Sequence, residues 1–99
     1  MPAYVVVQAE PLNLDEYRVY QQQVLPTIER HGGRFLVRGG TLELLEGTSP
    51  GRLVVIEFPS PEHAQAWYRS PEYQAIVPIR HQHGRTSFMV IAPGVQPIA

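Results

Sequence analysis

Three segments of this chain are apolar on both of their alternating faces, which restricts its fold more than any other feature. They are residues 3–9, 52–58 and 86–92, and each is rich in β-branched or other apolar side chains. Alternate side chains of a strand point to opposite sides of a sheet, so such strands need cover on both faces. A chain of 99 residues suffices for one core. We therefore expect a single domain over residues 1–99, with residues 93–99 as a C-terminal tail.

Two helical stretches separate these segments. Asn13, three residues before Glu16, is a typical start of a helix, which we expect over residues 14–31. A second helix is predicted from residue 61 and restarts at 71, because a serine, a proline and a glutamate stand in sequence at both points. Residues 34–38 predict a further strand, which we expect to continue through residues 41–46 after Gly39 and Gly40 and to turn at residues 47–51.

The resulting order, β-α-β-β-α-β, predicts an α+β sandwich of the ferredoxin-like type. In this arrangement an antiparallel sheet carries both helices on one face. The other face would then expose more apolar surface than the few hundred Å² that a soluble monomer usually shows. We therefore expect a homodimer through the sheet face.

Composition excludes several functional classes. The net charge is −1 and the basic residues are scattered, so we expect no nucleic acid partner. No apolar run is long enough to span a bilayer, which favours a cytoplasmic protein without a membrane partner. Lysine and cysteine are absent, which excludes Schiff-base, Walker-type and thiol chemistry. Neither a Rossmann fingerprint nor a G-x-S-x-G motif occurs, and we expect no cofactor.

Several strings along the chain resemble a bacterial family. They are residues 32–40 (GGRFLVRGG), 45–47 (LEG), 55–60 (VIEFPS) and 66–73 (AWYRSPEY). In this order they resemble domain of unknown function 1330, within the dimeric α+β barrel superfamily. The resemblance implies a ferredoxin-like fold and a dimer whose sheets form a barrel. Relatives elsewhere in that superfamily include cofactor-independent monooxygenases, haem-degrading enzymes and muconolactone isomerases, but a shared fold does not transfer their activities.

Arg38 and Glu57 are charged residues in otherwise apolar predicted strands. Buried charges are costly unless they are paired or used by a site. One hypothesis makes Arg38 the anchor of a ligand carboxylate, with Glu57 as its orienting partner or as a general base. The alternative is a structural ion pair between Arg38 and Glu57 at the end of the sheet. Arg34 is expected in solvent at a strand start.

Three aromatic side chains on the predicted helices, Tyr20, Trp67 and Tyr73, are candidates for ligand binding. Together they would line an aromatic pocket between the helices and the sheet, of the kind that flat organic molecules occupy. Aromatic residues at helical spacing are equally typical of an ordinary core. Both interpretations remain open from the sequence.

His81 and His83 are the strongest candidates for a metal site. In an extended segment the two imidazoles would point to the same side. No third ligand stands at a recognisable spacing, and Arg80 and Arg85 flank the pair with repelling charge. A solvated, cationic loop after a helix explains the segment without a metal, and we predict no metal site. His81 remains a weak candidate for a catalytic base, as does Glu57.

Three functions remain open. The first is a dimer whose cleft binds a carboxylate or aromatic metabolite. The second is a cofactor-independent monooxygenase or isomerase in which Glu57 or a cleft histidine moves a proton. The third is a non-catalytic dimerisation or accessory module, whose cleft its own side chains would fill.

Overall fold

One antiparallel sheet of four strands forms the centre of the computed structural model, which describes residues 1–48 and 51–95. The strands are β1 (Ala3–Pro11), β2 (Arg34–Arg38), β3 (Arg52–Phe58) and β4 (Gly84–Pro93). They lie in the order β2-β3-β1-β4, so β1 and β3 are central. All three neighbouring pairs are antiparallel. The predicted α+β, ferredoxin-like topology is confirmed.

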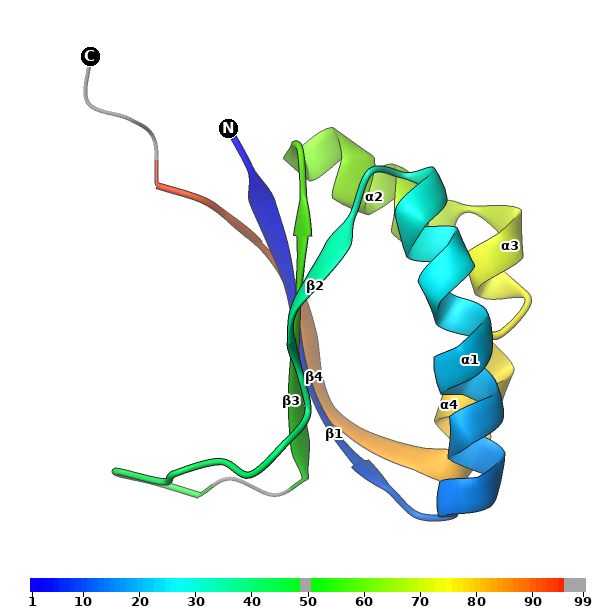
Figure 1. Cartoon of the computed structure of the whole chain (residues 1–99), viewed down its shortest axis with the longest axis vertical. Coiled ribbons are helices and arrows are strands. Elements are labelled where there is room, and N and C mark those ends of the chain that lie inside the picture. The colour runs from blue at the N-terminus through cyan, green and yellow to red at the C-terminus, as the bar shows by residue number, and fades with distance from the viewer. Residues whose placement is uncertain (49–50, 96–99) are drawn as a thin grey trace.

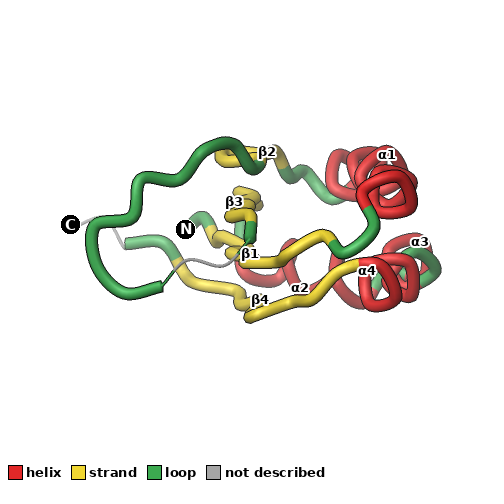
Figure 2. Tube along the Cα trace, turned by 90° about the horizontal axis from the view of Figure 1, so that it is seen from below, coloured by secondary structure: helices red, strands yellow, loops and turns green. Residues whose placement is uncertain are grey.

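The helices all cover the same face of this sheet (Figures 1 and 2). They are α1 (Leu14–Arg30), α2 (Pro61–Arg69), α3 (Pro71–Gln74) and α4 (Val77–His83). Within residues 1–48 and 51–95, each of them is too short or too polar to reach across a lipid bilayer.

The predicted capping residues explain where the helices begin. The side chain of Asn13 accepts a hydrogen bond from the backbone N–H of Glu16 at 3.2 Å. Ser60 Oγ accepts from the N–H of His63, and Ser70 Oγ accepts from the N–H of Tyr73, each at 3.2 Å. Each cap satisfies a donor that the first helical turn leaves without an intrahelical partner. The predicted restart after Ser70 is confirmed.

Alternation along β1 separates two surfaces of the sheet. Every second residue from Ala3 to Ala9 is buried against the helices. The core on that side is completed by apolar and aromatic side chains of the helices and of β3, the largest being Trp67, Tyr73, Phe58 and Ile28. The residues between them, such as Val6, face the opposite side, where Val55 of β3 and Val90 of β4 stand directly beside it in register. We call this second surface the outer face.

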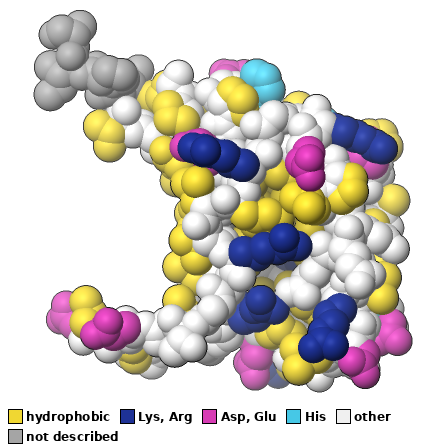
Figure 3. Space-filling view, in the orientation of Figure 1, with side chains coloured by type: hydrophobic (Ala, Val, Ile, Leu, Met, Phe, Trp, Pro, Cys, Tyr) yellow, Lys and Arg dark blue, Asp and Glu magenta, His cyan; other side chains and the backbone are white. Residues whose placement is uncertain are grey.

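No helix covers the outer face in the described part of the chain (Figure 1). Its apolar side chains are accordingly accessible: Phe88 is 40% exposed and Val90 46% exposed. The surface is concave between the projecting segment after β2 and the far end of β4, and hydrophobic side chains line this hollow (Figure 3).

The strand predicted over residues 41–46 is absent. The chain leaves the sheet at Gly39 and Gly40, which both adopt positive φ, and runs outward without a neighbouring strand (Figure 1). Alternating apolar residues predicted a strand, but the register of β2 with β3 ends at Arg38 opposite Val54. Leu45 on this projecting segment is 84% exposed. Residues 49–50 of the predicted turn and 96–99 of the predicted tail lie outside the described residues.

The prediction of a loop around residues 80–85 is also wrong. Residues 77–83 form α4, and β4 begins immediately at Gly84. His81 and His83 therefore lie on a helix, where residues two apart face different directions. The extended geometry that made them a metal candidate does not exist.

Candidate functional site

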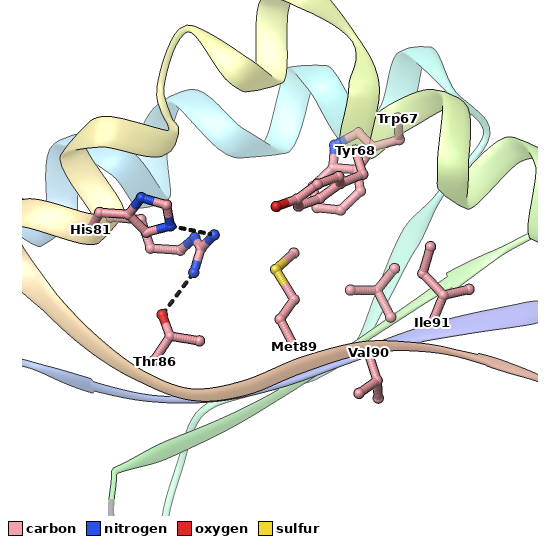
Figure 4. A pocket seen from close by; sticks show the side chains of 9 residues that line it. Trp67, Tyr68, His81, Thr86, Met89, Val90 and Ile91 are labelled. Atoms are coloured by element: carbon pink, nitrogen blue, oxygen red, sulfur yellow. Dashed lines mark hydrogen bonds between the residues drawn. The ribbon is translucent and has the colours of Figure 1, made fainter.

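A cavity of about 500 Å³ lies between the helices and the β4 edge of the sheet. Figure 4 shows Trp67 and Tyr68 entering it from α2, opposite Met89 and Ile91 of β4, with His81 and Thr86 at one end. Val90 borders the cavity as well, but its side chain points to the other side of the sheet. The walls are thus mainly apolar and aromatic, with polar groups gathered at one end. Pockets that hold flat organic ligands have this character.

Among the residues that line this cavity, Arg80 alone carries a permanent charge. Its residue is 3% exposed, and its Nη1 donates to Thr86 Oγ1 at 2.7 Å. Its Nη2 lies 3.3 Å from Nε2 of His81. A guanidinium only donates, so this Nε2 is the acceptor and the imidazole proton lies on Nδ1. These contacts leave Nε of Arg80, which is buried and has no hydrogen-bond partner.

No carboxylate in residues 1–48 and 51–95 forms a salt bridge with Arg80. Burying a charge without a counter-ion costs several kcal/mol. Arg80 lies in the last turn of α4, where the helix dipole favours a cation. That interaction contributes typically about 0.3–1 kcal/mol, up to about 2 in partly buried geometry, which does not offset the cost. The site therefore favours an anion.

Three buried tyrosines interact electrostatically with the same guanidinium. Burial raises the pKa of Tyr17 and of Tyr73, and the nearby Arg80 acts in the opposite direction. Burial also raises the pKa of Tyr20 well above its ordinary value, assisted by the adjacent Tyr73. The hydroxyls of Tyr20 and Tyr73 share a hydrogen bond of 2.9 Å. At neutral pH these groups are therefore neutral dipoles near Arg80, not counter-ions.

A second, smaller cavity of about 50 Å³ opens between α1 and the β2–β3 side of the sheet. Arg38 lies in its wall, over the Phe35 ring with 4.4 Å from Cζ to the ring centroid. Nη2 of Arg38 also donates to the backbone oxygen of Gln21 at 3.4 Å. Trp67, Arg80 and Met89 belong to the walls of both cavities, so the two spaces adjoin.

The predicted Arg38–Glu57 pair does not form. Arg38 pairs in register with Val54 and so faces the helices, whereas Glu57 pairs with Arg34 on the outer face. Glu57 accepts a hydrogen bond from Arg34 Nε at 2.8 Å. Arg34 is exposed, as expected, and it is the ion-pair partner of Glu57. The sheet separates Glu57 from both cavities, so it is neither an orienting partner for Arg38 nor a base there.

The predicted aromatic residues have different positions. Trp67 is fully buried, donates from Nε1 to Thr27 Oγ1 at 2.9 Å, and belongs to the walls of both cavities. Tyr20 lines the smaller cavity, while Tyr73 is fully buried and lines neither. The side chains of Trp67 and Tyr73 stack at 4.1 Å between ring centroids. Ligand binding by these residues stays a prediction.

His83 contacts the start of α1. Its backbone oxygen accepts from the N–H of Leu12 at 2.9 Å, and its Nε2 lies 4.0 Å from Glu16 Oε2. In residues 1–48 and 51–95, no three side chains of His, Asp or Glu come together in a metal-binding arrangement.

Arg80 is the residue that the sequence analysis missed. It stands three residues after Val77, and both residues are buried on α4, so they share the buried stripe of that helix. An arginine on such a stripe is the pattern that marks a buried cation. The pattern was hidden because the segment was assigned to a loop.

Comparison with known proteins agrees with this fold. Residues 2–95 match the family model described as Domain of unknown function (DUF1330). The chain belongs to this family. The predicted family is thereby confirmed, and it carries no assigned activity. No functionally curated protein matches the DUF1330 chain.

Solved structures with this fold include proteins of known and unknown function. RPA0582 of Rhodopseudomonas palustris, of unknown function, has 22% identity and a TM-score of 0.69 over 97% of this chain and 84% of its own. SnoaB, a cofactor-independent oxygenase from Streptomyces nogalater, has 12% identity and a TM-score of 0.64 over 98% and 96%. A dimeric ferredoxin-like protein of unknown function from Bacteroides fragilis has 16% identity and a TM-score of 0.54 over 94% and 95%. At these identities the likeness shows the fold alone.

Proposed function

We propose that this DUF1330 protein binds a flat organic anion, such as an aromatic carboxylate, in the cavity between α2, α4 and β4. The observation that carries the proposal is the buried guanidinium of Arg80, which has no carboxylate partner among the described residues and an unsatisfied Nε. A ligand carboxylate at Nε would satisfy that donor and compensate the charge. The Trp67 ring and Met89 would contact the apolar body.

The test compares 2-naphthoate with its neutral analogue 2-naphthamide by isothermal titration calorimetry. A hydrogen bond to a charged group contributes about 1.5–3 kcal/mol, so we expect the carboxylate to bind at least about tenfold more tightly. Arg80→Met should reduce this ratio to near one. Arg85→Gln, at an exposed residue that lines neither cavity, is the matched control and should keep it. An Arg80→Met protein that still prefers the carboxylate tenfold would refute the proposal.

The functional unit in this proposal is a homodimer that buries the outer face. Phe88 and Val90 are exposed on the outer face, and a second copy would cover the hollow lined with hydrophobic side chains that Figure 3 shows. The Bacteroides fragilis protein with the same fold is dimeric, which supports this assembly. Light scattering should give twice the chain mass of 11.2 kDa. A mass of one chain at micromolar concentration would contradict the dimer.

A single substitution tests the surface used. Val90→Glu should yield monomers, because a carboxylate in the centre of an apolar interface would be desolvated without a partner. Ala66→Glu, on an exposed position of α2, should remain dimeric. Dimers of unchanged stability in Val90→Glu would place the interface elsewhere.

A second function, proton transfer without a cofactor, is favoured by the position of His81. Its Nε2 lies beside Nη2 of Arg80 at the end of the cavity. A bound anion that attracts Nη2 would free the Nε2 lone pair, which could then take a proton from the ligand while Arg80 stabilises the resulting enolate. The likeness in fold to an oxygenase described as cofactor-independent is consistent with this chemistry.

Phenylpyruvate is a suitable probe, because it is flat and anionic and carries an acidic C–H. Exchange of its benzylic protons in D₂O, followed by NMR, should be accelerated by the wild-type protein and slowed about 10²-fold or more by His81→Ala. His63→Ala, on an exposed residue of α2, is the control. Exchange at the buffer rate with the wild-type protein would exclude the proton-transfer function while leaving ligand binding intact.

A further inference from the structure

The smaller cavity has a wall with an unusual charge. Three of the eight arginines, Arg38, Arg52 and Arg80, line it, and its lining includes neither an aspartate nor a glutamate. None of the three forms a salt bridge within the described residues. Like charges that line one small space repel each other, and an anion between them would offset this repulsion. The chain has a net charge of −1, so this concentration does not follow from an excess of arginine.

Two of these side chains reach the cavity from adjacent strands. Arg38 of β2 pairs with Val54 of β3, and Arg52 precedes Val54 by two residues, so both lie on the helix-facing side. The Arg52 guanidinium lies against Gly39, where a Cβ atom would collide with it. Gly39 also needs its positive φ of 77° to leave the sheet. The turn after β2 thus brings Arg52 next to Arg38.

Arg38 and Arg52 both line the smaller cavity, in the gap between α1 and the sheet. Figure 3 shows dark blue side chains gathered over this gap, and all of them are arginine because the chain has no lysine. The cavity of about 50 Å³ is adequate for a carboxylate-sized group but not for a whole aromatic ligand. Gln21 stands at the same rim, and the backbone oxygen to which Arg38 donates belongs to it.

The smaller cavity adjoins the larger one through Trp67, Arg80 and Met89. Met89 is unbranched and flexible, so it can yield to a ligand that crosses between the two spaces. Trp67 stands in the wall of each space, beside the junction. A ligand whose rings lie at this junction, with one anionic group at Arg80, can extend its far end toward Arg38 and Arg52.

We infer that the ligand class is an elongated aromatic dianion, with its second anionic group held by Arg38 and Arg52. This inference rests on the proposed function, because it assumes that the first anionic group lies at Arg80. It makes the smaller cavity a subsite that discriminates diacids from monoacids.

The experiment compares 2,6-naphthalenedicarboxylate with 2-naphthoate by calorimetry, and the readout is the ratio of their dissociation constants. We expect the diacid to bind wild-type protein about tenfold more tightly or better, and the ratio to approach one in Arg38→Gln/Arg52→Gln. Arg85→Gln should keep the wild-type ratio. Equal affinities in wild-type protein, or a diacid preference that survives in the double variant, would overturn the inference.

Three further results separate this inference from its premise. Binding of 2-naphthoate that depends on Arg80, without a preference for the diacid, would leave the proposed function standing and remove the second subsite. In the second result, inorganic phosphate binds wild-type protein but not the double variant, while the diacid binds no more tightly than 2-naphthoate. That result would show a site for free anions and would also overturn the inference. Wild-type protein that binds neither naphthalene compound at millimolar concentration would refute both.

Discussion

The Arg80 guanidinium donates to the Thr86 hydroxyl across 2.7 Å and thereby joins the last turn of α4 to the start of β4. The five residues between them include the junction at Gly84, where helix passes directly into strand. A Cβ atom at Gly84 would collide with the Tyr17 ring, so the chain approaches α1 closely at this point. The cation of the proposed site is therefore held by the fold and not by a partner carboxylate.

Arg80→Met should leave the protein at least as stable as the wild type. Replacement of buried ionic groups by apolar side chains of similar volume is often neutral or stabilises by about 1–4 kcal/mol. Urea unfolding in the absence of ligand measures this change. A loss of more than about 2 kcal/mol would mean that the tyrosine hydroxyls and Thr86 already compensate the charge.

The Tyr20–Tyr73 hydroxyl pair should show strong coupling. Either single change to Phe removes one partner of a buried hydrogen bond and should destabilise by about 1–3 kcal/mol, because the other hydroxyl is left unsatisfied. The double variant should lose less stability than the sum of the losses in the two single variants. Tyr4→Phe, on the outer face, serves as the control. Additive losses in the urea double-mutant cycle would show that the two hydroxyls do not depend on each other.

Alkaline pH should destabilise the protein through the same tyrosines. Burial raises the folded-state pKa of Tyr17, Tyr20 and Tyr73 above the unfolded value of about 10. Their contribution to the stability of the fold is therefore fully present below pH about 10. It is lost as the pH rises through the raised folded-state pKa values. For each tyrosine, the free energy of unfolding then falls by up to about 1.4 kcal/mol per pH unit.

Urea midpoints between pH 8 and 11 measure this loss. The Tyr20→Phe/Tyr73→Phe variant should lose stability less steeply than the wild type above pH 10. Identical slopes in the two proteins would show that other groups control alkaline unfolding.

Thr27→Val should disturb the aromatic core without changing its volume much. The Trp67 indole N–H donates to Thr27 Oγ1 in a fully buried setting, and loss of the acceptor leaves that donor unsatisfied at a cost of about 1–3 kcal/mol. The fluorescence of the single tryptophan should shift as well. Thr41→Val, on the exposed projecting segment, is the matched control. Unchanged stability and spectrum in Thr27→Val would show that the bond contributes nothing.

Local patterns predicted the sheet, the helix starts and the family, because each depends on a few adjacent residues. Asn13, Ser60 and Ser70 cap the helices as expected, and the two-sided apolar strands appear with an uncovered outer face. The prediction of a strand over residues 41–46 was wrong because a strand needs a neighbouring strand to pair with. The pairing of β2 with β3 ends at Arg38.

The site was harder to predict, because it depends on which side of the sheet each charge faces. A bulge between Phe35 and Val37 shifts the register, so Arg34 and Arg38 point to opposite sides although they are four residues apart. Simple alternation would have put them on the same side. That shift places Arg34 beside Glu57 and directs Arg38 to the opposite side of the sheet.

The most direct test of the account is a crystal structure of the protein soaked with 2-naphthoate. The account predicts the carboxylate within hydrogen-bond distance of Nε of Arg80, and the naphthalene rings against Trp67 and Met89. A carboxylate bound away from Arg80, with its Nε still unsatisfied, would contradict it.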